Sequence, residues 1–152
     1  MIIGIDPGKT GAIAFVNKNG IEVIDTPLNK GDYDIDEMSD ILDESTFSEE
    51  VERVFIEKVH SMPGQGVASM FNFGMGYGIW LGICSAFKYP VTLVTPQEWK
   101  KEMNLISKPK DDARAKVMKL FPKHSLLVPR KKDIGRADAI LIAEYGKRKL
   151  LK

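Results

Sequence analysis

Residues 1–11 read MIIGIDPGKTG, and this stretch decides how the rest of the chain is interpreted. A short apolar run, typical of a buried strand, ends on Asp6, and a tight Pro-Gly turn follows at once. Buried strands rarely end on an acid unless a cation is held there. The stretch therefore predicts a first strand that carries one carboxylate to its end.

Two further carboxylates have comparable settings. Glu57 ends the apolar segment 54–56, and Asp138 interrupts the apolar, helix-like segment 137–143. Three acids far apart in sequence, each carried by an apolar element, indicate a shared divalent-metal site, because Mg²⁺ prefers hard oxygen ligands. The alternative for each acid is a surface position at the end of an element.

The composition is that of an ordinary globular chain, with 28% charged residues and one cysteine among 152 residues. This length predicts a single domain over residues 1–152. No run approaches the roughly 20 apolar residues of a membrane span, so we expect no membrane partner. Cys84 cannot form an intramolecular disulfide and no signal sequence is apparent, which favours a reducing cytoplasm.

The net charge of +1 hides a strong asymmetry along the chain. Residues 1–90 carry 6 Lys/Arg and 14 Asp/Glu, a net charge of −8, whereas residues 91–152 carry 16 and 7, a net charge of +9. A basic C-terminal portion is typical of a polyanion-binding face. The alternative is a pair of solvated helices balanced by the acidic half.

Hydrophobic periodicity predicts an alternation of strands and helices. The predicted strands are 2–6, 11–17, 21–26, 51–59 and 91–95, and the predicted helices are 35–45, 66–88, 96–102, 111–120 and 135–149. Three meandering strands followed by strand–helix–strand units imply an α/β fold, with a five-stranded mixed sheet flanked by helices on both faces.

Two nucleotide-binding motifs resemble the opening stretch but do not fit it. A P-loop needs four residues between its glycines and a helix after the loop, whereas only three residues separate Gly4 from Gly8 and a strand follows. The Asp-x-Gly-x-Thr turn of the actin and sugar-kinase ATPases occurs in two domains, in chains more than twice this length. This sequence has no second copy of that turn, so we expect no nucleotide cofactor.

A better match covers nearly the whole chain. The segments GIDPG (4–8), FIE (55–57) and ADAILIA (137–143) occur in the order and approximate spacing of one family. The chain resembles the RuvC-type Holliday junction resolvases, within the ribonuclease H-like superfamily. The segments PGQG (63–66), VTPQEWK (94–100) and GRADA (135–139) resemble the phage-encoded branch, which would place the protein in the cytoplasm of a bacterial host.

The resemblance implies a metal-dependent crossover junction endonuclease with two Mg²⁺ ions, for which Mn²⁺ should substitute. Asp6, Glu57 and Asp138 match the family's catalytic metal ligands. The family's usual position for a fourth acid is Gly135 here, and Asp133 is the candidate to replace it. Five residues along one helix place side chains about 140° apart, so Asp133 serves only if it precedes regular helix. Its alternative role is that of a helix-start residue.

The resemblance also implies contacts with DNA. Lys110 aligns with a functional lysine of the family that would stabilise developing negative charge, and the alternative is a phosphate-tracking or solvated lysine. His60 falls where relatives present an aromatic wedge. Since phosphate contacts supply most nonspecific affinity, basic residues dominate the expected DNA-binding set. That set is Lys9, His60, Lys108, Lys110, Arg114, Lys131, Lys132 and Arg136.

Gly74, Gly78 and Gly82 form a small-residue stripe, which indicates close backbone approach to the protein's own sheet or to a second copy. The resemblance implies a homodimer whose two sites nick matching strands of a four-way DNA junction, leaving a 5′ phosphate and a 3′ hydroxyl. Two alternatives remain open. One is a broader nuclease of branched DNA, acting on forks or flaps. The other is a junction-binding protein with weak or lost catalysis, motivated by Gly135.

Overall fold

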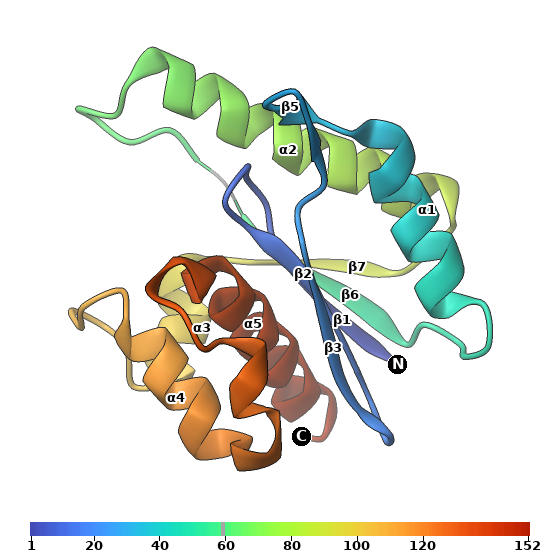
Figure 1. Ribbon diagram of the computed structural model, residues 1–152, viewed down its shortest axis with the longest axis vertical. Helices are drawn as coiled ribbons and strands as arrows, with labels where there is room; N and C mark the ends of the chain where they lie inside the picture. Colours follow the sequence, from blue (N-terminus) through green and yellow to red (C-terminus); the bar gives the residue numbers. More distant parts are fainter. Residues whose placement is uncertain (59) are drawn as a thin grey trace.

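The computed structural model describes residues 1–58 and 60–152, and a five-stranded mixed sheet lies at its centre (Figure 1). The strands are β1 (Ile2–Asp6), β2 (Ala12–Asn17), β3 (Gly20–Asp25), β6 (Arg53–Glu57) and β7 (Val91–Val94), in the spatial order β3-β2-β1-β6-β7. The pairs β1–β2 and β2–β3 are antiparallel, and the pairs β1–β6 and β6–β7 are parallel. The predicted mixed sheet is confirmed.

Helices cover both faces of this sheet, as the sequence predicted. They are α1 (Ile35–Thr46), α2 (Val67–Ala86), α3 (Pro96–Glu102), α4 (Asp112–Leu120) and α5 (Ile134–Leu150). Figure 1 shows α1 and α2 on one side of the sheet and α3, α4 and α5 on the other. The predicted strand 51–59 is shorter than expected, because regular pairing covers only Arg53–Glu57, and Val59 lies outside the described residues.

The alternation of side chains along β1 divides the core in two. Ile3 and Ile5 pack with α1 and α2, whereas Ile2 belongs to the core formed with α5. Gly4 lies on that second face too, because a Cβ on it would collide with the carbonyl of Ala139 in α5. Asp6 continues the same face, so its carboxylate lies on the side of the sheet that α5 covers.

A small hairpin was not predicted. Strands β4 (Leu28–Asn29) and β5 (Asp32–Tyr33) pair antiparallel across Lys30 and Gly31, whose positive φ angles of 51° and 82° suit a two-residue turn. The Tyr33 hydroxyl donates to the Asn72 carbonyl of α2 at 2.7 Å. Strands this short depend on such tertiary contacts, which no local pattern reports. Two 3₁₀ turns, η1 (Pro122–Leu127) and η2 (Lys131–Asp133), also went unpredicted.

Helix α2 corrects one expectation from the sequence. Among the described residues it is the one helix long and apolar enough to cross a membrane by length and composition, and little of it is buried. The expectation that no run reaches this length is therefore wrong. Glycines interrupt the apolar pattern but leave the segment without a charge. Length and composition alone are weak grounds for a membrane span.

Candidate active site

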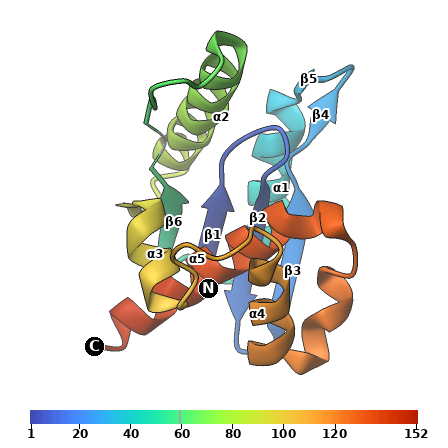
Figure 2. The same cartoon turned by 90° about the vertical axis from the view of Figure 1, so that its left-hand side faces the viewer.

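Asp6 and Glu57 lie at the ends of neighbouring parallel strands. In the pairing of β1 with β6, Ile5 lies opposite Ile56, so the next residue of each strand is an acid. Figure 2 shows the two strands side by side and pointing the same way. Phe55 packs in the core on the α5 side, and Glu57, two residues later, faces that side as well. The two carboxylates therefore leave one edge of the sheet on the same face.

Asp138 comes to the same place from α5. The close approach of Ala139 to Gly4 sets the N-terminal half of this helix directly on β1, near the strand end that carries Asp6. The three predicted acids line one hollow of about 480 Å³, which we call the acidic hollow. The structure thus brings together side chains that are 51 or more positions apart in the sequence.

Burial raises the pKa values of all three acids, and repulsion from other carboxylates adds to this effect for Asp6 and Asp138. The pKa of Asp6 lies well above its usual range because the carboxylate is buried and senses Asp138 and Glu57. Burial, followed by the charge of Glu57, raises the pKa of Asp138 to about 7. Burial also raises the pKa of Glu57, against a hydrogen bond from Trp99 and the charges of Lys100 and His60, which lower it. A cation would relieve this concentration of negative charge.

The chemistry of these residues fits Mg²⁺, since carboxylate oxygens are the ligands it prefers and a few suffice. Nevertheless, over residues 1–58 and 60–152, no group of three or more His, Cys, Asp and Glu side chains stands in a geometry that could hold a metal ion as it is. Asp6, Glu57 and Asp138 are close enough to shift one another's pKa values, and binding would require their side chains to draw together.

Five lysines line the same hollow as the acids, and we call them the lysine rim. The lysines that line the hollow are Lys100, Lys108, Lys110, Lys131 and Lys132. Four of them were in the predicted DNA-binding set. Lys100 was missed, although it lowers the pKa values of all three acids and its Nζ lies 5.5 Å from the ring centroid of Trp99. Its place at the end of the 94–100 motif was the only signal in the sequence that pointed to it.

The structure does not support Asp133 as a fourth metal ligand. Its carboxylate is 2% exposed, accepts the backbone N–H of Arg130 at 2.8 Å and pairs with the Arg130 guanidinium, also at 2.8 Å. These contacts hold the pKa of Asp133 below its usual range. Asp133 does precede α5, but its side chain is not among those that line the acidic hollow. The alternative role at the helix start fits its contacts.

Gly135 explains why no acid occupies the family's usual position. A Cβ on Gly135 would collide with the backbone carbonyl of Thr10, in the turn that follows Asp6. The first turn of α5 therefore packs against the backbone of the Asp6–Thr10 turn. Any side chain at position 135 would push the two apart. The absence of a carboxylate here follows from packing.

Two arginines of the predicted DNA-binding set have structural contacts. Arg136 forms a two-pronged ion pair with Asp25 of β3, at 2.7 and 2.9 Å. Arg114 pairs with Asp111 at 2.8 Å and donates to the Val128 carbonyl. Neither lines the acidic hollow, so their contacts do not support the predicted role in DNA binding.

Lys9 and His60 lie outside the lining of the hollow as well. Lys9 turns toward the β4–β5 hairpin, with its Nζ 3.6 Å from Asp32 and 5.9 Å from the ring centroid of Tyr33. His60 is exposed and near enough to Glu57 to lower the pKa of that acid. His60 is therefore placed to meet a ligand that approaches the acids, whereas Lys9 is engaged elsewhere.

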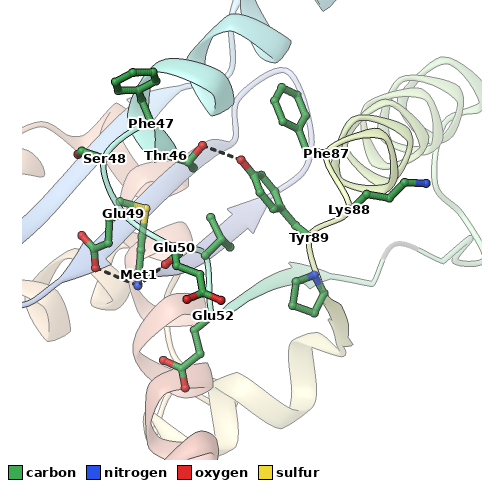
Figure 3. A pocket seen from close by; sticks show the side chains of 12 residues that line it. Met1, Thr46, Phe47, Ser48, Glu49, Glu50, Glu52, Phe87, Lys88 and Tyr89 are labelled. Atoms are coloured by element: carbon green, nitrogen blue, oxygen red, sulfur yellow. Dashed lines mark hydrogen bonds and ion pairs between the residues drawn. The ribbon is translucent and has the colours of Figure 1, made fainter.

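A second hollow, of about 1110 Å³, lies where β1 begins and is lined by Met1, residues 46–52 and residues 87–90 (Figure 3). Three of its residues are glutamates, but the Met1 ammonium group pairs with Glu49 at 3.0 Å and donates to the Glu50 carbonyl. None of the three predicted acids lines this hollow. Its contacts tie the chain's start to the loop before β6.

Sequence comparison matches part of this chain to a known protein. No family model matches the chain. The chloroplast Holliday junction resolvase MOC1 of Chlamydomonas reinhardtii is 32% identical over 93 residues, which are 60% of this chain and only 10% of that protein. This chain therefore spans about a tenth of the length of the curated relative.

Solved structures match over nearly the whole chain. Thermus thermophilus RuvC, in complex with a Holliday junction substrate, has a TM-score of 0.65 and 18% identity, covering 97% of this chain and 94% of that one. The yeast mitochondrial Holliday junction resolvase Ydc2 has a TM-score of 0.60 and 16% identity, covering 97% and 78%. The fowlpox virus Holliday junction resolvase has a TM-score of 0.52 and 16% identity, covering 98% of both chains. The resemblance is confirmed at the level of the fold: this chain has the ribonuclease H-like fold of the RuvC-type resolvases.

Proposed function

We propose that this protein is a Mg²⁺-dependent endonuclease that resolves four-way DNA junctions. The observation that carries the proposal is one hollow lined by three carboxylates and five lysines. Lysines attract the DNA backbone, and carboxylates hold the metal at which a phosphate is cleaved. The relatives with this fold are named as Holliday junction resolvases, and the RuvC and fowlpox structures include junction DNA.

Asp6, Glu57 and Asp138 would hold the metal, and Asp6 is the acid whose carboxylate senses both of the others. Two Mg²⁺ ions bound there would supply a nucleophilic water and neutralise charge on the phosphate. Lys100 and Lys110 both act on Asp138, so they lie where they can stabilise charge that develops on the phosphate oxygens. Hydrolysis joins the water oxygen to phosphorus and breaks the P–O3′ bond. The products carry a 5′ phosphate and a 3′ hydroxyl.

We further propose that two copies pair through α2, which Figure 1 shows along the outer side of the molecule. A Cβ added at Gly74, Gly78 or Gly82 would meet nothing within 4 Å, so the small-residue stripe is not used against the protein's own sheet. Val67 and Phe71 on the same helix are 86% and 65% exposed. A second copy would cover this uncharged surface and allow close backbone approach.

The dimer is tested by light scattering during size-exclusion chromatography. Gly78→Glu places a charge in the centre of the open stripe, where the structure leaves room for it. We expect the wild-type protein to elute at twice the mass of the chain, and the variant at the mass of one chain. A monomeric wild-type protein at micromolar concentration would overturn this proposal.

The nuclease is tested with an immobile four-way junction and a matching linear duplex, with Mg²⁺, with Mn²⁺ and with EDTA. We expect paired, metal-dependent nicks on opposing strands of the junction alone. Asp6→Asn should abolish cleavage and leave junction affinity within a few-fold, because the lysine rim is intact. Equal loss of binding and cleavage in that variant would contradict the catalytic assignment.

Two other results would favour other functions. Cleavage of forks and flaps as readily as junctions would indicate a broader nuclease of branched DNA. Tight junction binding without any nick would indicate a binding protein. Two observations favour this second candidate: a side chain at position 135 would collide with the Thr10 carbonyl, and the Asp133 carboxylate is bound by Arg130.

A further inference from the structure

We propose that Trp99 is a positioning residue whose indole N–H holds one carboxylate oxygen of Glu57 and so leaves the other oxygen for a metal ion. The inference rests on the proposed function. Trp99 is 0% exposed, and its Nε1–H donates to Oε2 of Glu57 at 2.6 Å. A bond this short, to an acceptor that carries a charge, belongs to the strong class of hydrogen bonds.

The pairing of two strands sets this contact. In the parallel pair β6–β7, Glu57 lies opposite Val94, and the backbone N–H of Lys58 donates to the Val94 carbonyl at 2.7 Å. Trp99 follows Val94 by five positions, in the first turns of α3. The indole therefore returns to the strand end from which Glu57 projects.

The start of α3 is rigidly held, which fixes the direction of the indole. The Thr95 side chain accepts the backbone N–H of Glu98 at 3.3 Å, and the Glu98 carboxylate accepts the backbone N–H of Thr95 at 2.7 Å. This reciprocal pair satisfies backbone N–H groups at the start of the helix, and Pro96 at the first helical position has no N–H that needs a partner. A donor on such a support can hold an acceptor in one orientation.

The hydrogen bond occupies only one of the two carboxylate oxygens of Glu57. Oε2 is engaged by the indole, and within the described part of the chain Oε1 has no hydrogen-bond partner. Glu57 lines the acidic hollow, whereas Trp99 does not, so Trp99 acts through Glu57 and has no contact with a ligand in the hollow. Donors behind a metal ligand set its orientation, and their loss typically costs about 10–100-fold in metal affinity.

Trp99 also belongs to the core on the α5 side, so its packing has to be separated from its hydrogen bond. The chain has two tryptophans, and the other provides the control. Trp80 is also 0% exposed, and its Nε1–H has no partner among the residues that the structure describes. Trp80→Phe therefore removes a buried indole and an unused N–H, whereas Trp99→Phe removes a buried indole and the bond to Glu57.

The experiment measures Mn²⁺ binding to the metal-free protein from the loss of the free-ion EPR signal. A second variant keeps the shape of the indole: in the Trp80→Phe background, Trp99 is replaced by 3-benzothienylalanine, in which sulfur takes the place of the N–H. We expect Trp80→Phe to bind Mn²⁺ like the wild type. Trp99→Phe and the benzothienyl protein should bind about 10–100-fold more weakly. Circular dichroism checks that each variant is folded.

A fluorescence measurement gives a readout that packing alone would not move. In Trp80→Phe, all tryptophan emission comes from Trp99, and Mg²⁺ should shift it because the indole touches a metal ligand. In Trp99→Phe, the emission of Trp80 should not respond. Mn²⁺ affinity unchanged in the benzothienyl protein would overturn the positioning role while metal-dependent cleavage by the wild type still upheld the proposed function. A wild-type protein that binds no Mn²⁺ and cleaves no junction would overturn both.

Discussion

Asp138→Asn is expected to stabilise the metal-free protein near neutral pH, although it removes a residue of the candidate active site. Burial and the charge of Glu57 raise the pKa of Asp138 from 3.8 to about 7. Between these values the unfolded chain has lost this proton and the folded chain keeps it. Folding therefore takes up a proton, and stability falls as pH rises from the unfolded pKa to the folded pKa.

The shift sets the size of the effect. Each pKa unit corresponds to about 1.4 kcal/mol, so the ionised Asp138 costs the folded state at most about 4 kcal/mol at pH values above its folded pKa. The acids of the site titrate together and share this cost, and removing one charge relieves its neighbours. We therefore expect Asp138→Asn to raise the free energy of unfolding by about 1–3 kcal/mol at about pH 8.

The assay is urea unfolding in EDTA at several pH values. The gain should shrink at about pH 5 and nearly vanish near pH 4, where the unfolded chain is half protonated as well. Asp40→Asn, at an exposed position of α1, is the control and should show no such trend. Mg²⁺ should stabilise the wild type more than the variant. A variant that is less stable than the wild type at about pH 8, or a gain independent of pH, would refute the reasoning.

Substitutions at three further positions separate packing from DNA contact. Gly135→Ala should cost about 1–3 kcal/mol of stability because its Cβ meets the Thr10 carbonyl. In thermal unfolding, Gly135→Asp should be no more stable than Gly135→Ala. Arg136→Ala should cost up to about 1 kcal/mol, through the ion pair with Asp25, and leave junction affinity by fluorescence anisotropy within about two-fold. Lys131→Ala should leave stability unchanged and lower the salt dependence of junction binding by about one unit. Weaker binding by Arg136→Ala than by Lys131→Ala would contradict this division.

Local pattern was enough to find the five strands of the sheet, the five α-helices and all three acids. Strand 2–6 ends on Asp6, and the strand containing 54–56 ends on Glu57, because an apolar run that stops at an acid is visible in the residues themselves. Asp138 was found because a charge within the apolar segment 137–143 breaks its pattern. Family resemblance then assigned the chemistry.

Contacts between segments far apart in the chain could not be predicted from the sequence. Asp133 was a reasonable fourth ligand until Arg130 was seen to hold its carboxylate. Lys100 and Trp99 looked like ordinary members of a helix, since nothing local reports that α3 returns to the end of β6. The β4–β5 hairpin was missed for the same reason, because its contact with α2 is the hydrogen bond from the Tyr33 hydroxyl.

The sequence by itself determined the order of strands and helices, the mixed sheet and the acids at the strand ends, because periodicity and strand termination are properties of neighbouring residues. Only the tertiary structure decided which charges meet. The collision of a Cβ at Gly135 with Thr10 excludes a fourth acid there, and the lysine rim forms because α3, the loop before α4 and the turn before α5 converge on one hollow. Distances between segments far apart in the chain arise from packing, which no local window of residues contains.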